Sequence, residues 1–137
     1  ISGPQLDRID LHVEIQPVPF DKLSGLASGE SSASIRERVL RARAVQEARY
    51  ADEPSIHCNA QLSSRLMARH CVLGPDAMAI VKLAMEKYDM SARAYDRILK
   101  VARTIADLDG SESILARHVS EAVGYRTLDK ASWGHGY

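Results

Sequence analysis

The chain has 137 residues, and its 18 Lys and Arg balance 18 Asp and Glu, so the formal net charge is zero. Hydrophobic residues make up 45% and charged residues 26%, which is typical of a globular domain and excludes a disordered or membrane-embedded chain. The balanced charge argues against strong sequence-independent binding of nucleic acid by this chain alone. No apolar run approaches the roughly 20 residues that cross a bilayer, and no signal sequence is evident, so we expect a cytoplasmic protein with no membrane partner.

The two cysteines, Cys58 and Cys71, each follow a histidine. Adjacent residues on a helix point about 100° apart, so a His-Cys dipeptide does not easily converge on one ion. Zinc sites also separate their paired ligands by two or more residues. Free thiols in a reducing compartment are therefore the simpler interpretation, and no metal site is expected.

Segment 9–16 alternates apolar and polar residues without exception, which is the pattern of a half-buried β-strand, and Pro17 and Pro19 end it. A lone strand leaves its backbone donors and acceptors unpaired, so we expect its neighbours to lie in sequence beyond this chain. Residues 1–20 are thus interpreted as the end of a larger core. Glycines and serines in residues 21–33 indicate a linking loop.

The first helix is predicted over 34–50, because Ser34 and Glu37 have the spacing of a capping box. Its apolar stripe is narrow. A charged helix face is most simply a solvated one, although a role facing a ligand stays open. The basic residues of this helix are Arg36, Arg38, Arg41, Arg43 and Arg49.

Two further helices are predicted over 61–71 and from Pro75 to about Tyr88, since proline suits the first position of a helix. Leu62 and Leu66 share one side of the shorter helix. The longer helix is expected to bury one apolar face, formed by Met78, Val81, Met85 and Tyr88 and widened by Ile80, Leu83 and Ala84.

The strongest helical pattern covers 91–108, with Ser91 as N-cap and Gly110 as the stop. Its wide apolar face consists of Tyr95, Ile98, Leu99, Ala102, Ile105 and Ala106. Three cations fall on the opposite face, namely Arg93, Arg97 and Lys100. This helix thus packs against a core and presents positive charge on its other side.

A last helix is predicted from Ser111 or Ser113 to about Val123, with Ile114, Leu115, Val119 and Ala122 on its apolar face. The predicted fold is mainly α: a helical bundle of about five helices over 34–130, preceded by one isolated N-terminal strand. Residues 131–137 form a tail interrupted by glycine.

Motifs of nucleotide-binding and hydrolytic enzymes are missing: the sequence has no phosphate loop, GxGxxG, GxSxG or HExxH. The chain is therefore not expected to be a catalyst on its own. It does carry arginines on ordered elements: Arg8 lies beside the predicted strand, and Arg93 lies in the first turn of the helix predicted over 91–108. An arginine fixed on a rigid element is a common way to place a cation against a transferring phosphoryl group.

Four separated motifs resemble, in the same order, the C-terminal end of the magnesium-chelatase-related AAA+ ATPases, and more narrowly their ComM type. They are GPQLDRIDLHV at 3–13, SIRERV at 34–39, SARAYDRI with ARTIADL within 91–108, and EAVGYRTLD at 121–129. The resemblance covers nearly the whole chain. It implies the last strand of a nucleotide-binding core followed by a helical lid, with the Walker A and Walker B motifs upstream.

The resemblance also implies roles for two arginines. Arg93 corresponds to the sensor 2 residue, which contacts the γ-phosphate, and Arg8 resembles an arginine finger that reaches a nucleotide on the neighbouring subunit. Alternatively, Arg8 only pairs with Asp7 or Asp10, and Arg93 is one solvated charge among three. The sequence has Gln5 where the family usually has leucine, which affects the local geometry beside Arg8.

The cofactors implied for the full-length protein are ATP and Mg²⁺, neither of which is expected to bind this chain tightly. The implied partners are the upstream AAA+ core, further copies in a homo-oligomeric ring, expected to be a hexamer, and DNA, on which the protein would act as a helicase or in branch migration. One alternative is the motor subunit of magnesium chelatase, which serves tetrapyrrole synthesis. Another, of a different class, is a freestanding helical DNA-binding or adaptor module.

Overall fold

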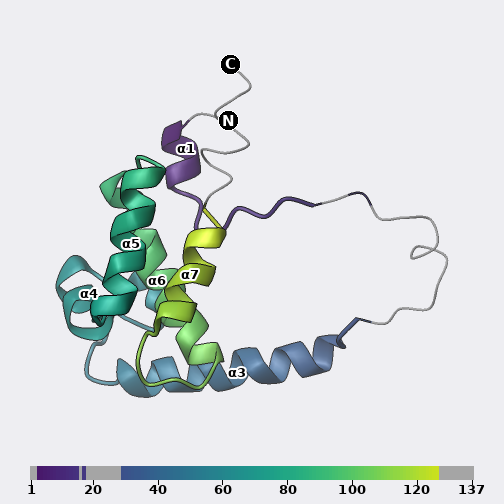
Figure 1. Ribbon diagram of the computed structural model, residues 1–137. Helices are drawn as coiled ribbons and strands as arrows, with labels where there is room; N and C mark the ends of the chain where they lie inside the picture. Colours follow the sequence, from purple (N-terminus) through teal and green to yellow (C-terminus); the bar gives the residue numbers. More distant parts are fainter. Residues whose placement is uncertain (1–2, 16, 18–28, 127–137) are drawn as a thin grey trace.

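The computed structural model describes residues 3–15, 17 and 29–126, and in this part of the chain the fold is a helical bundle without strands (Figure 1). This confirms the predicted mainly α class. The elements are α1 (Gly3–Asp7), α3 (Ser32–Arg49), the 3-10 turn η1 (Asn59–Gln61), α4 (Ser64–His70), α5 (Pro75–Lys87), α6 (Ala92–Leu108) and α7 (Ala116–Gly124). None of these helices is long and apolar enough to cross a membrane.

Helix α6 lies at the centre of the bundle and contacts α7, α3, α4 and η1, while α5 packs against α7. The predicted ends of α6 are confirmed: the Ser91 Oγ accepts a hydrogen bond of 3.2 Å from the Ala94 N–H, and Gly110 takes a φ of +71° just after the helix. The predicted apolar face is also confirmed. Its buried members are Ile98, Leu99, Ala102 and Ala106, with Tyr95 and Ile105 partly buried beside them.

Helix α5 begins at Pro75 as predicted, and most of its predicted apolar face is confirmed, because Ile80, Met85 and Tyr88 pack against the core beside the buried residues. The buried residues are Ala77, Val81 and Ala84, whereas Met78 is 43% exposed and Leu83 is 65% exposed. The small side chains face the bundle, where α5 packs against α7. The prediction was wrong for Met78 and Leu83, and it missed Ala77, because a small alanine carries little hydrophobic signal.

The strand predicted over 9–16 is not formed in its described residues, 9–15. A β-ladder needs a second strand, and the described part of the chain provides none. The alternating apolar residues therefore have no sheet to cover: Val13 is 66% exposed and Ile15 is 87% exposed. The segment is instead held by a hydrogen bond of 2.8 Å from the His12 N–H to the Tyr125 carbonyl at the end of α7.

The helix predicted to start at Gln61 begins at Ser64, so Leu62 lies before it rather than on it. Two further predicted helix starts are displaced by a few residues. Ser31, not Ser34, caps α3, because its Oγ accepts from the Ser34 N–H at 3.2 Å. Helix α7 begins after Leu115 rather than at Ser111 or Ser113, because His118 supplies the cap: its Nδ1 accepts the Leu115 N–H at 2.9 Å. Both errors arise because several serines precede each helix and each fits a capping pattern.

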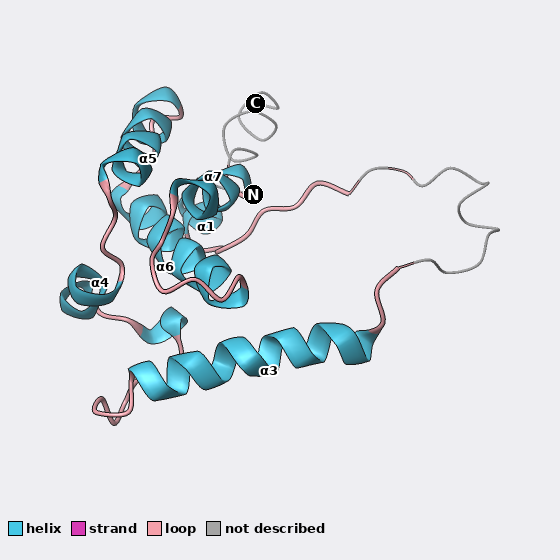
Figure 2. Cartoon of the chain, turned by 60° about the horizontal axis from the view of Figure 1, so that its bottom comes forward, coloured by secondary structure: helices cyan, strands magenta, loops and turns pink. Residues whose placement is uncertain are grey.

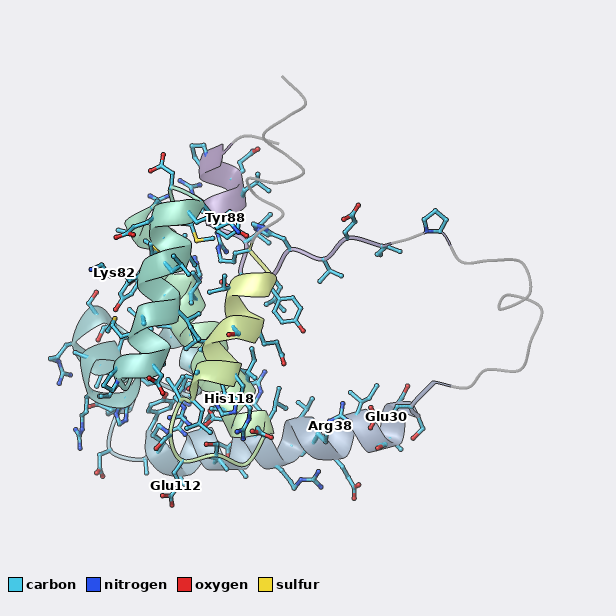
Figure 3. The ribbon with its side chains drawn as sticks, viewed as in Figure 1. Glu30, Arg38, Lys82, Tyr88, Glu112 and His118 are labelled. Atoms are coloured by element: carbon cyan, nitrogen blue, oxygen red, sulfur yellow. The ribbon has the colours of Figure 1, made fainter. Side chains whose placement is uncertain are left out.

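Helix α3 is anchored only near its C-terminal end. Its buried residues are Ala42 and Gln46, and the half that begins at Ser32 extends away from the other helices (Figure 2). An exposed ion pair between Glu30 and Arg38 lies near the projecting end (Figure 3). Most of the loop predicted over 21–33 and the whole tail predicted over 131–137 lie outside the described residues, so those boundaries stay predictions.

Candidate functional site

The two arginines singled out from the sequence border the same hollow. This hollow has a volume of about 310 Å³ and is lined by Arg8, Arg93, Asp96, Arg97 and Lys100. All three cations predicted on the polar face of α6 thus line it, and Arg8 joins them from the segment that follows α1. The structure thus brings Arg8 together with residues that lie more than 80 positions later in the chain.

The four cations of this hollow differ in what they contact. The Arg97 guanidinium forms an ion pair of 2.9 Å with the Asp10 carboxylate, and the Lys100 ammonium donates to the Ala60 carbonyl at 3.2 Å. Within residues 3–15, 17 and 29–126, the side chains of Arg8 and Arg93 have no hydrogen-bonding or ion-pair partner, and both are exposed. These two guanidiniums are therefore the groups available to an anion.

One alternative for Arg8 was an ion pair with a neighbouring carboxylate. Asp10 does not provide it, because among the described residues its carboxylate pairs with Arg97 and not with Arg8. The side chain of Asp7 lies outside the described part, so that pairing stays untested. Arginine binds phosphate and carboxylate oxygens through a planar fork of N–H donors, so two such groups at one hollow suit a phosphate.

The segment that carries Arg8 is fastened to the end of α7 by Arg126. This arginine is fully buried, and its guanidinium donates to the backbone carbonyls of Leu6 at 3.2 Å, of Ile9, and of Asp10 at 3.4 Å. His12 adds a second link, because its N–H donates to the Tyr125 carbonyl at 2.8 Å, while its Nε2 donates to the Leu6 carbonyl within the segment at 3.0 Å. No role for Arg126 was predicted from the sequence beyond its place in a motif.

A second buried network, also missed from the sequence, joins α3 to α6 at Asp107. The Asp107 carboxylate accepts hydrogen bonds from Arg49 at 2.6 and 2.9 Å, from Asn59 at 2.9 Å and from Arg103 at 3.2 Å. Its side chain is fully buried. Burial works to raise the pKa of this carboxyl, but the hydrogen bonds from Arg49 and Asn59 and the nearby positive charges outweigh it and hold the pKa below its ordinary value.

The partners in this network extend it into the loops. The Arg103 guanidinium donates to the carbonyls of Ser111 at 2.9 Å and Glu112 at 3.0 Å, so it shapes the turn between α6 and α7. The hydrogen bond from Arg49 to Asp107 raises the pKa of the Arg49 guanidinium further above its already high value. The signal in the sequence was the i, i+4 pair of opposite charges, Arg103 and Asp107, at the edge of an otherwise apolar face.

No cluster of three metal-binding side chains occurs among the residues that the structure describes. Cys71 is buried, and burial raises the pKa of its thiol to about 11, which disfavours the thiolate that binds a metal. For ATP, the residues present fit part of a site. The chain offers two cations for a phosphate, but its sequence has no loop to cradle the remaining phosphates.

Comparison with known proteins decides the family. Residues 29–126 match the family described as magnesium chelatase, subunit ChlI C-terminal. The chain belongs to this ChlI C-terminal family. The match begins just before α3 and ends at Arg126, so the bundle described above is the matched domain. In fold terms it is the lid domain of a magnesium-chelatase-like AAA+ protein, as the resemblance implied.

Similar full-length proteins place this ChlI C-terminal domain within the ComM type. The chain is 42% identical over 129 residues to competence protein ComM of Haemophilus influenzae, a match that covers 93% of this chain and 24% of ComM. It is 41% identical over 131 residues to YifB of Salmonella typhimurium and 40% identical over 131 residues to YifB of Escherichia coli, each covering 95% of this chain and 25% of YifB. The chain thus spans about a quarter of the length of these relatives.

Proposed function

We propose that this lid domain senses nucleotide in a ring-forming AAA+ ATPase, with Arg93 as the sensor 2 residue that contacts the γ-phosphate. The observation that carries the proposal is the pair of exposed arginines at one hollow. Arg93 sits in the first turn of the central helix, whose position is fixed by its buried face. A guanidinium held on such a helix is already in position, so little free energy is spent on moving it when charge develops on a phosphoryl group.

Arg8 is proposed as the arginine finger, which reaches the nucleotide bound by a neighbouring subunit. Because Arg8 and Arg93 border the same hollow, we assign both to the same phosphate group, so that both act on the nucleotide bound by the neighbouring subunit. Two guanidiniums then share the charge of the transferring phosphoryl group, which is the main task of a protein in phosphoryl transfer. Asp10 keeps Arg97 engaged beside them, so the hollow directs two of its four cations at the ligand.

ATP and Mg²⁺ are proposed to bind mainly to the AAA+ core of the full-length protein. Bound there, Mg²⁺ would neutralise phosphate charge, while Arg8 and Arg93 of this chain orient the terminal phosphate. The chain of 137 residues alone is expected to show no ATP turnover, and turnover by the purified chain would contradict the proposal. We propose a hexameric ring in the cytoplasm as the working form.

For the whole protein we propose ATP-driven work on DNA, as a helicase or in branch migration. The proposal rests on the similarity to a protein named competence protein ComM. The family description favours a second candidate, a motor subunit that drives magnesium insertion into protoporphyrin. Hydrolysis by the full-length protein separates the two, since branched DNA should stimulate it in the first case and protoporphyrin in the second.

The test of the site uses the full-length protein and measures ATP hydrolysis and nucleotide binding separately. Arg93→Ala is expected to lower turnover by about 100-fold while nucleotide still binds. Arg8→Ala should act in the same direction, and mixing it with an intact subunit should restore part of the turnover, since a finger acts on the neighbour. Lys82→Ala, an exposed cation on α5 (Figure 3), is the matched control and should leave turnover unchanged. Unchanged turnover in Arg93→Ala would remove Arg93 from the site.

A further inference from the structure

Arg126 is the most deeply buried charged residue among those the structure describes, with 0% of its surface exposed. Arginine is rarely buried to this extent unless its donors are satisfied. Here the guanidinium donates to backbone carbonyls on a segment more than a hundred positions earlier in the chain. Such a contact is specific, because the carbonyls must be presented in an arrangement that matches the planar fork of donors.

The three carbonyls that Arg126 binds lie on either side of Arg8. Leu6 belongs to the last turn of α1, while Ile9 and Asp10 directly follow Arg8. A helix as short as α1 has little stability of its own, and its terminal carbonyls have no partner within the helix. Arg126 binds the Leu6 carbonyl before Arg8 and the Ile9 and Asp10 carbonyls after it, so it holds the backbone on both sides of Arg8.

Two further contacts hold the same segment against the lid. The His12 N–H donates to the Tyr125 carbonyl at 2.8 Å, next to Arg126. The Asp10 carboxylate pairs with Arg97, which lies one helical turn after Arg93 on α6. The segment is therefore fixed to the end of α7 and to the helix that carries Arg93.

We propose that Arg126 is a positioning residue, which sets the place of Arg8 relative to Arg93 by clamping the backbone on both sides of Arg8. The inference rests on the proposed function, in which these two arginines bind one phosphate. Arg126 itself is buried and does not line the hollow. Its effect on hydrolysis therefore passes through Arg8.

The experiment is a double-mutant cycle in the full-length protein, with turnover as the readout. Arg126→Lys keeps the charge, but its three donors radiate from one nitrogen and do not reproduce the two separated nitrogens with which Arg126 binds the carbonyls. Turnover should fall by about 10- to 100-fold, since a displacement of about 1 Å is enough to misalign a catalytic group. In the Arg8→Ala background the same substitution should change turnover by less than about twofold, because the group that it positions is already gone.

Arg49→Lys is the matched control, since Arg49 also forms a buried interaction but lies in the network between α3 and α6. Any loss of turnover caused by Arg49→Lys should be of the same factor in the wild-type and in the Arg8→Ala background. If Arg126→Lys lowers turnover by the same factor in the Arg8→Ala background as in the wild type, Arg126 is a general stabilising residue and the inference is wrong. If Arg8→Ala itself leaves turnover unchanged, the proposed role of Arg8 fails first, which is a distinguishable result.

Amide hydrogen exchange provides a readout that does not depend on hydrolysis. Arg126→Lys should speed exchange of the His12 amide and its neighbours in 6–12 while leaving the amides of α3 unchanged. Unchanged exchange rates of the amides in 6–12 would contradict the proposal that Arg126 holds this segment. Should Arg126→Lys fail to fold, His12→Phe replaces it, because it removes the bond to the Leu6 carbonyl and keeps a ring of similar size. The same loss of turnover, absent in the Arg8→Ala background, is then expected.

Discussion

Arg49 and Asp107 join the C-terminal end of α3 to the C-terminal end of α6 through two hydrogen bonds, 2.6 Å from Nη2 to Oδ1 and 2.9 Å from Nη1 to Oδ2. The paired geometry makes full use of the arginine fork. Asp107 is fully buried and Arg49 is mostly buried, so neither group is compensated by water if its partner is removed.

Asp107→Asn should therefore destabilise the fold strongly. The substitution leaves the Arg49 and Arg103 guanidiniums without a carboxylate, and breaking a buried ion pair typically costs about 3–5 kcal/mol. Urea unfolding of the chain, followed by circular dichroism, measures the change. Glu30→Gln is the control, because it breaks the exposed pair with Arg38 and should leave the midpoint unchanged. Equal effects of the two substitutions would contradict the buried network.

The same carboxylate should make stability depend on pH in acid. The pKa of Asp107 is lower in the folded chain than in the unfolded one, so the unfolded state binds more protons around pH 4 and stability rises with pH there. The contribution is complete above the unfolded pKa of about 4 and is lost as the pH falls through the lower folded pKa. Urea midpoints measured between about pH 2 and 6 should therefore show a shallower slope in Asp107→Asn than in the wild type. An identical slope would exclude Asp107 as a contributor.

Cys71 should resist alkylation in the folded chain, whereas Cys58 should react. Cys71 is buried with a thiol pKa of about 11, so about one molecule in a thousand carries the thiolate at pH 8. Cys58 is only half-buried. Iodoacetamide labelling followed by mass spectrometry should modify Cys58 first and Cys71 only after urea is added. Fast labelling of Cys71 in a folded Cys58→Ser chain would contradict the buried position.

Two glycine substitutions should change the free energy of unfolding in opposite directions. Gly110 has a φ of +71°, so Gly110→Ala places a side chain in the left-handed region and should cost about 1 kcal/mol. Gly124 is the last residue of α7, and nothing lies within 4 Å of the position that its Cβ would occupy. Gly124→Ala should stabilise the chain by about 0.5–1 kcal/mol. Urea unfolding of both variants tests the pair, and destabilisation by Gly124→Ala would be the unexpected result.

The parts of the fold that sequence predicted well are those set by local signals. Helix α6 was located to within one residue because Ser91, Gly110 and an apolar face of period 3.6 all act within the helix itself. The start of α7 was misplaced, because its cap is the side chain of His118 and not one of the nearby serines. The prediction of a strand over 9–16 was wrong because a strand depends on a partner strand, which an alternating pattern within one segment does not provide.

The candidate site was predictable only in part. Arg8 and Arg93 were selected because their motifs resemble a family, but their shared hollow depends on how the segment around Asp10 and His12 is held against α6 and the end of α7. That path is set by Arg126, whose acceptors are backbone carbonyls and so leave no mark in the sequence. Asp107 and Arg49 were missed for a related reason, since nothing local pairs residues of two different helices.

Helix α3 is packed against the bundle near its C-terminal end, so a small rotation there moves its N-terminal end through a much larger distance. Its 18 residues span about 27 Å, and its buried residues all lie in the half nearer the contact between Arg49 and Asp107. A rotation of about 10° at that pivot would carry the far tip through about 5 Å. A small rotation of α6 that is passed on through the contact between Arg49 and Asp107 would therefore become a larger displacement at the Ser32 end of α3.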